Sequence, residues 1–279
     1  MCRTLKVSTS GFYDWRSRKP SARSLLRDRI ASAAAESHAE SHEVYGYRRV
    51  HTDVVEDHKI PCCGETIRSV MAALGLQGKH KKRFVRTTDS DHDRPVAANL
   101  LQRDFSAAGP NRKWLADITY IATRQGWLYL ATVLDAFSRR VVGWSMSDRI
   151  DAALVCDALD MAVGMRCPDE GLIHHSDRGS QYASESMAKL LDLHGIEVSM
   201  SRKADPWDNA MQESFFGTLK TEWADGVYES RDEAKRELFK YIELFYNPRR
   251  RHSSLGNISP VEYERRWKNG TLTPVNQAA

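Results

Sequence analysis

The order of apolar segments after residue 110 constrains the fold of this chain more than any other feature. Three strand-like runs come first, and helices and strands then alternate. The expected strands are residues 113–123, 127–137, 141–147, 172–175 and 197–201, and the expected helices are residues 151–165, residues 184–194 and a long helix after Asp208-Asn209. This order predicts an α/β fold: a mixed five-stranded sheet with flanking helices.

Three acidic residues stand where an isolated charge is poorly tolerated. Asp117 interrupts the first strand-like run, Asp177 ends the fourth, and Glu213 lies on the long helix, with 35 residues between the last two. A desolvated carboxylate must be paired, hydrogen-bonded or bound to a metal ion, because leaving it alone costs several kcal/mol. Two other acids have simpler explanations, Asp208 as the cap of the long helix and Asp135 as the residue that fixes the turn after the second strand.

The three acids suit a magnesium site. Mg²⁺ prefers oxygen ligands and keeps waters and substrate phosphates in its shell. Two such ions, roughly 3.5–4 Å apart, activate the attacking oxygen and stabilise the leaving oxygen of phosphoryl transfer. We expect Asp117, Asp177 and Glu213 to be catalytic residues and ligands of two Mg²⁺ ions, which Mn²⁺ can replace. His174 and His175 have no spaced partner and are expected to support the strand end.

The first third of the chain has the pattern of a small all-α domain. Residues 45–76 hold two amphipathic segments around a turn at residues 60–64, which is typical of a helix-turn-helix. A shorter pattern of the same kind occupies residues 2–20, and a helix is expected from residue 21 to about residue 43. In DNA-binding versions the second helix enters the major groove, so Arg68 is a candidate DNA contact. Such domains also occur without DNA.

Basic charge is concentrated in the same part of the chain. Residues 1–98 carry a net charge of +6 and residues 99–279 a net charge of −2, as expected if the first part meets phosphate. The run at residues 79–86 suits an arm that follows the DNA backbone. A second basic run, at residues 247–252, either binds DNA or forms a solvated loop. The candidate contacts in the two runs are Lys81, Lys82, Arg83, Arg249 and Arg250.

These patterns suggest a domain plan. The expected parts are a helix-turn-helix-like region at 1–92, a linker at 93–110, a catalytic domain at 111–270 and a flexible tail at 271–279. No apolar stretch approaches the roughly 20 residues that cross a bilayer, so we expect a cytoplasmic protein without a membrane partner. The five cysteines show no CxxC pair and are expected to be free thiols.

Several stretches of the chain closely resemble a known family. They are WLADITYI, WLYLATVLDAFSRRVVGW, HHSDRGSQY, DNAMQESFFGTLK and YNPRRRHSSLGNISPVEY. They resemble the OrfB-type transposases of bacterial insertion sequences of the insertion sequence three family, whose core is similar to that of retroviral integrases. The element order is that of ribonuclease-H-like folds. The resemblance implies that the three acids are the metal-binding triad, that Lys220 and Gln212 face transposon-end DNA, and that Arg178 shapes the loop beside Asp177 near the DNA.

The resemblance also bears on partners. Active members of the family are usually frameshift fusions with an upstream domain that carries its own helix-turn-helix and an oligomerising helix. The sequence begins at Met1, and we expect this chain to lack that domain. We therefore expect a homo-oligomer on DNA, with the upstream reading-frame product as a fusion or a partner.

The predicted function is Mg²⁺-dependent end cleavage and strand transfer on double-stranded DNA, with transposon ends and target as substrates. Water first frees a 3′-OH, which then attacks a target phosphodiester. Two alternatives stay open: a ribonuclease-H-type nuclease, and a DNA-binding regulator that is inactive without the upstream domain. Without DNA and metal, Glu213 is expected to lie too far from the aspartates to complete the site.

Overall fold

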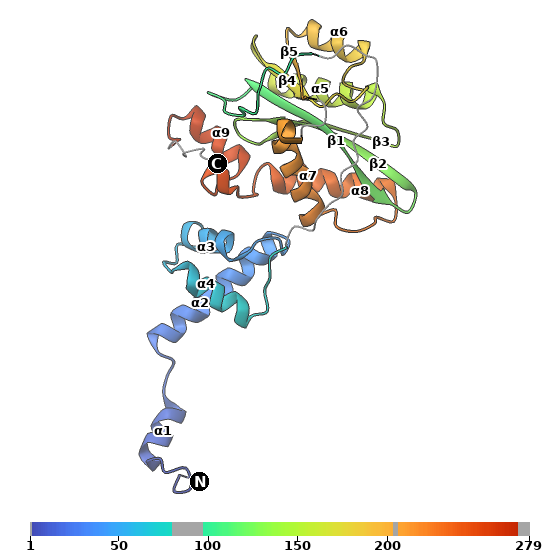
Figure 1. Cartoon of the computed structure of the whole chain (residues 1–279). Helices are drawn as coiled ribbons and strands as arrows, with labels where there is room; N and C mark the ends of the chain where they lie inside the picture. The colour runs from blue at the N-terminus through green and yellow to red at the C-terminus, as the bar shows by residue number, and fades with distance from the viewer. Residues whose placement is uncertain (1, 80–96, 203–205, 273–279) are drawn as a thin grey trace. The chain divides into compact units, whose positions relative to one another are not determined.

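The computed structural model describes residues 2–79, 97–202 and 206–272 (Figure 1). The chain divides into two compact units, Met1–Lys79 and His80–Ala279. Each unit has a hydrophobic core of its own. The predicted contacts Lys81, Lys82 and Arg83 lie outside the described residues, as does the start of the expected linker.

The first unit is helical. Its helices are α1 (Thr9–Ser17), α2 (Ala22–Glu40), α3 (Tyr47–Glu56) and α4 (Gly64–Ala73). The long helix α2 packs against both α3 and α4, and the core includes Ala34 of α2, Val50 and Val54 of α3, and Ile67 of α4. Within the described residues, α1 buries no side chain. The helix pair α3 and α4 therefore has the layout that the sequence predicts for a helix-turn-helix.

The second unit is built on one mixed sheet. Its strands are β1 (Lys113–Thr123), β2 (Gly126–Asp135), β3 (Val141–Ser147), β4 (Ile173–Ser176) and β5 (Glu197–Met200). They lie in the order β3-β2-β1-β4-β5. The strands β1, β2 and β3 form an antiparallel meander, whereas β4 is parallel to β1 and β5 is parallel to β4. This arrangement confirms the predicted mixed five-stranded sheet.

Helices cover both faces of the sheet (Figure 1). The helices α5 (Ala152–Arg166) and α6 (Glu185–Leu193) share a core with Trp114 and Ala116 of β1. Because side chains alternate along a strand, Leu115 points to the other face, where α7 contacts β1 and α8 contacts both β1 and β2. The elements that follow β5 are η1 (Pro206–Asn209), α7 (Ala210–Glu222), α8 (Arg231–Phe239), the π-helical η2 (Lys240–Tyr246), η3 (Ser253–Leu255) and α9 (Pro260–Lys268).

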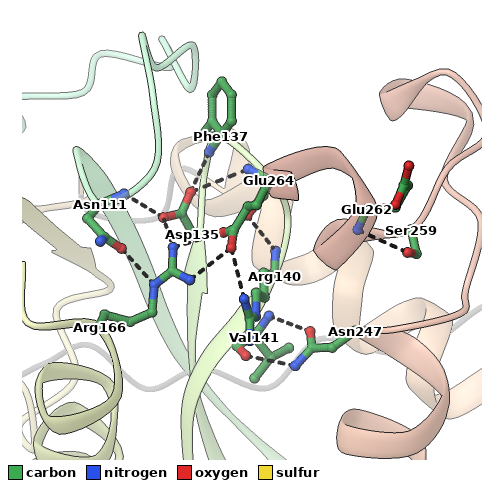
Figure 2. Close-up of polar contacts among 11 residues, drawn as sticks. Asn111, Asp135, Phe137, Arg140, Val141, Arg166, Asn247, Ser259, Glu262 and Glu264 are labelled. Carbon is green, nitrogen blue, oxygen red and sulfur yellow. Dashed lines mark hydrogen bonds and ion pairs between the residues drawn. The ribbon is translucent and has the colours of Figure 1, made fainter. Parts of the chain in front are cut away.

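A charged network fastens α9 to the sheet (Figure 2). The Glu264 carboxylate accepts hydrogen bonds from Arg140 at 2.9 Å and from Arg166 at 2.8 Å, and the Ser138 hydroxyl donates to it at 2.8 Å. Beside it, Asp135 accepts from the backbone N–H of Phe137 at 2.9 Å, and burial raises the pKa of Asp135 to about 6. Asp135 therefore holds the turn between β2 and β3, as expected from its position.

Candidate active site

Sheet register brings two of the three predicted acids together. In the parallel pairing of β1 with β4, the last pair is Leu115 opposite His175, and Asp117 and Asp177 each lie two residues further along the chain. Asp117 is half-buried, and its Oδ1 accepts from the backbone N–H of Ile118 at 2.8 Å. Burial and the nearby Asp177 carboxylate raise the pKa of Asp117 well above its ordinary value, and Glu213 contributes in the same direction.

The Asp177 side chain lies in a tight turn after β4. Its Oδ1 accepts from the backbone N–H of Gly179 at 2.8 Å. A Cβ at Gly179 would lie 3.0 Å from that oxygen and 2.9 Å from Oε1 of Gln181, so a larger residue would push the Gln181 amide aside and crowd the carboxylate. The neighbouring Arg178 is half-buried and donates from Nε to the carbonyl of Ser201 at 2.7 Å, which agrees with its expected part in shaping this loop.

The third acid comes from α7. Glu213 is exposed in the first turn of this helix, and Lys220 follows seven residues, or about two turns, later. The Lys220 ammonium lies 4.3 Å from the centre of the Tyr120 ring. Burial lowers the pKa of Lys220, whereas nearby Tyr120 and Asp117 act in the opposite direction. The helix therefore brings a carboxylate and a half-buried cation to the part of the unit that holds Asp117.

The donor set of this site suits a hard metal ion. The predicted ligands are carboxylate oxygens, and a further oxygen nearby, Oδ1 of Asn209, is buried without a hydrogen-bond partner among the described residues. The Nδ2 of Asn209 reaches the carbonyl of Ala116 at 3.4 Å, next to Asp117. As placed, no three His, Cys, Asp or Glu side chains of the described residues are grouped closely enough to hold an ion. The site thus has suitable ligand atoms, but they do not form a complete coordination shell around one metal position.

The two histidines before Asp177 are part of the interior. His175 is buried, with Nδ1 at 2.8 Å from the Ser199 hydroxyl and Nε2 at 3.1 Å from the Ser201 hydroxyl. Burial lowers the pKa of His175 to about 4 and that of His174 to about 3, so both rings are neutral near pH 7. They support the strand end, as expected.

Three sequence-based interpretations need correction. Gln212 is fully buried and bonded to β1 and β2, so its amide does not face DNA. Arg250 is buried against Glu222 rather than presented to solvent. Asp208 does not cap α7, because its carboxylate accepts from the backbone N–H and the guanidinium of Arg202, which lowers its pKa to about 2.

The other predicted DNA contacts differ in setting. Arg68 is exposed on α4 and forms an ion pair with Glu65 at 2.7 Å. Arg249 is exposed after η2.

Two further polar groups lie close to the acids. The Tyr182 hydroxyl is buried without a partner among the described residues, and its pKa is raised well above the ordinary value by burial and by Asp117 and Asp177. The other is Asn209, described above. Both lie within stretches that carry the family resemblance.

Comparison with known proteins agrees with this geometry. Two family models described as integrase core domain match residues 107–206 and 194–260, and a model described as HTH-like domain matches residues 26–84. Transposase InsF for insertion sequence IS3A of Escherichia coli is 42% identical over 267 residues, which cover 95% of this chain and 92% of the relative. The chain belongs to the IS3 family of transposases.

A second relative extends the similarity. The insertion element IS600 uncharacterized 31 kDa protein of Shigella sonnei is 41% identical over 268 residues, covering 96% of this chain and 98% of that protein. The predicted family, fold and enzyme class are thereby confirmed: the IS3-family chain is a DDE transposase, a polynucleotidyl transferase with an integrase core. Among the described residues of this transposase, no helix has the length and apolar character needed to cross a membrane.

Proposed function

We propose that this transposase cuts and joins DNA phosphodiester bonds at a site formed by Asp117, Asp177 and Glu213. The observation that supports this assignment is the β1–β4 register, since Asp117 and Asp177 each lie two residues beyond its last pair and both are half-buried. Two like charges in such a place disfavour each other, as the raised pKa of Asp117 reflects. A bound cation would relieve this cost, and Glu213 lies near enough to influence the same carboxylate.

The metal assignment follows from the donor atoms. The three carboxylates would hold Mg²⁺, in two ions, with Mn²⁺ as a replacement. When bound, the metal would polarise the scissile phosphate and lower the pKa of the attacking water or hydroxyl. The protein's own part is to keep Asp117 and Asp177 in register and to bring Glu213 from α7. Oδ1 of Asn209 has no hydrogen-bond partner among the described residues and would accept a hydrogen bond from a water molecule at the site.

The DNA is proposed to approach along α7. The Lys220 ammonium is held beside Tyr120 and close to Asp117, where it would meet a backbone phosphate near the reacting bond. Arg178 is proposed to order the turn under the DNA. Further backbone contacts are proposed for Arg68, Arg249 and the basic run at residues 81–83.

The finer expectations on partners and organisation stay proposals. They are double-stranded transposon ends and target as substrates, a homo-oligomer on DNA, and the upstream reading-frame product as fusion or partner. The family and its HTH-like domain support DNA binding itself. The domain boundaries at residues 92, 110 and 270 and the cytoplasmic address likewise stay predictions.

The test uses the full chain with a DNA duplex that carries the terminal sequence of its own element. With Mg²⁺ we expect nicked ends and joined strands, and Asp177→Asn should lower the rate at least roughly 100-fold, since even outer partners of metal ligands cost about 10- to 100-fold. Asp192→Asn, at an exposed acid on α6, is the matched control and should retain activity. Full activity in Asp177→Asn would refute the assignment.

The products of the same assay separate the alternatives. Cleavage without joined strands would indicate a nuclease. If the chain binds DNA but neither cuts nor joins it, and adding the upstream reading-frame protein restores both reactions, the chain needs that protein as a partner.

A further inference from the structure

The residue before Glu213 is a glutamine that lies in the protein interior. Gln212 is fully buried, and its Nε2 donates to the carbonyl of Leu115 at 2.6 Å and to the carbonyl of Thr132 at 3.1 Å. Its Oε1 accepts from the Thr132 hydroxyl at 3.3 Å. Thr132 is the β2 residue that pairs with Asp117 across the β1–β2 ladder. One amide therefore joins α7 to both strands at the level of Asp117.

Burying a glutamine side chain at this position is energetically unfavourable unless its amide is hydrogen-bonded. Burying an amide is unfavourable without hydrogen bonds, and an apolar side chain of similar size fills a core without that requirement. The neighbours Met211, Phe215 and Leu219 are buried and supply the apolar packing of α7. The hydrogen bonds of the Gln212 amide form only when α7 has one rotation about its axis and one position along that axis, so they fix both.

A second amide attaches the same end of α7. Asn209, one turn earlier, donates from Nδ2 to the carbonyl of Ala116 at 3.4 Å. Leu115 and Ala116, the two acceptors on β1, immediately precede Asp117. A slip of α7 by one residue would turn Glu213 by about 100° and shift it by about 1.5 Å, and it would break these bonds.

We propose that Gln212, with Asn209, is a positioning residue that fixes the place of Glu213 relative to Asp117 and thereby sets the metal affinity of the site. This inference rests on the proposed role of Glu213 as a metal ligand. It assigns Gln212 to the interior support of the site instead of the DNA surface.

The experiment is a double-mutant cycle on the full-length protein. Gln212→Met keeps the size of the side chain and removes its polar bonds, and Glu213→Asp withdraws the carboxylate by one methylene. Metal affinity is measured by calorimetry with Mn²⁺, and stability by melting in a chelator. Thr221→Val is the matched control, because the buried Thr221 hydroxyl bonds the carbonyl of Gly217 at 2.7 Å in the last part of the same helix.

We expect Gln212→Met to weaken Mn²⁺ binding roughly tenfold or more, the range seen for outer partners of metal ligands. Thr221→Val should lower the melting temperature without changing Mn²⁺ affinity. The Gln212→Met and Glu213→Asp effects on affinity should be non-additive, because a carboxylate already out of place loses little more by being shortened. Additive effects, or unchanged affinity in Gln212→Met, would overturn the proposal.

Two further variants keep the outcome decisive. If Gln212→Met does not fold, Thr132→Val serves in its place, because it removes only the hydroxyl bond to Gln212. We then expect a smaller loss of Mn²⁺ affinity, of roughly twofold to threefold. No loss of affinity would overturn the proposal. Glu213→Gln reports on the metal-ligand role itself. Unchanged affinity in Glu213→Gln overturns that role and this inference together, whereas loss in Glu213→Gln with none in Gln212→Met overturns this inference alone.

Discussion

Replacing Arg250 by methionine tests whether this arginine stabilises the fold or contacts DNA. Arg250 and Glu222 are 5% and 6% exposed, and the guanidinium donates to both carboxylate oxygens, with Nε at 2.6 Å from Oε2. The Tyr241 hydroxyl donates to the same carboxylate at 3.2 Å. The pair joins the C-terminal end of α7 to the segment that follows η2. Methionine would leave the Glu222 carboxylate buried without its arginine partner.

The size of the effect follows from this burial. Removing one partner of a buried ion pair costs about 3–5 kcal/mol, because the other charge stays desolvated. For a unit of about 200 residues, each kcal/mol lowers the melting temperature by about 2–4 °C, so the expected loss is about 6–20 °C. Replacing both partners, in Arg250→Met with Glu222→Leu, should recover at least half of the loss, because a buried pair is often replaceable by apolar residues.

The assay is thermal and urea unfolding followed by DNA binding of the folded protein. Arg249→Ala is the control at the neighbouring exposed arginine. It should leave stability nearly unchanged, and it should weaken DNA binding if the basic run contacts DNA. An Arg250→Met protein that keeps wild-type stability but binds DNA more weakly would refute the reasoning and restore the DNA-contact interpretation.

Other residues give predictions of different kinds. Lys220→Ala should weaken DNA binding to a similar extent for all sequences. The slope of log Kd against log salt concentration should fall by about one, the value for one lost phosphate contact, whereas an unchanged slope would mean that Lys220 does not contact phosphate. Metal-free protein should lose stability as the pH rises from about 4 through the raised pKa of Asp117, because the folded state then carries a disfavoured charge. In the presence of a chelator, the urea unfolding midpoint should fall less with rising pH in Asp117→Asn than in the wild-type protein. Parallel plots of midpoint against pH for the two proteins would contradict this. Glu264→Gln should speed hydrogen exchange across α9, because two arginines lose their charged partner; unchanged protection would mean that apolar contacts alone hold the helix.

The sheet was predictable because its signals are local. Strand-like runs and their turns locate β1 to β5 within a few residues, and the meander followed by alternating helices and strands selects the mixed order. The segment at residues 231–246 was missed, although Ala234, Leu238, Tyr241 and Phe245 recur at helical spacing and are buried in α8 and η2. That pattern was readable and would have predicted the helix.

The errors at the site have a different origin. The DNA-facing prediction for Gln212 came from the family resemblance, and nothing in the sequence shows that Leu115 and Thr132 offer carbonyls to this side chain. Likewise, Arg250 lies in a basic run that suits phosphate, while its partner Glu222 is 28 residues away in sequence. Such pairings depend on tertiary contacts, which periodicity and spacing do not encode.

The three acids are therefore held by attachments of unequal strength. Asp117 lies in β1 and Asp177 directly follows β4, each two residues beyond Leu115 and His175, the last pair of the parallel β1–β4 ladder. Glu213 belongs to a helix whose first turn is joined to the sheet by two side-chain amides and apolar packing, and whose last turn is joined to the rest of the unit by the Arg250–Glu222 pair. Because α7 is held by side-chain contacts whereas β1 and β4 are joined by backbone hydrogen bonds within the sheet, we expect local opening to displace Glu213 before the two aspartates. We therefore expect the position of Glu213 to vary more than the positions of Asp117 and Asp177, and the contacts that hold α7 to control it.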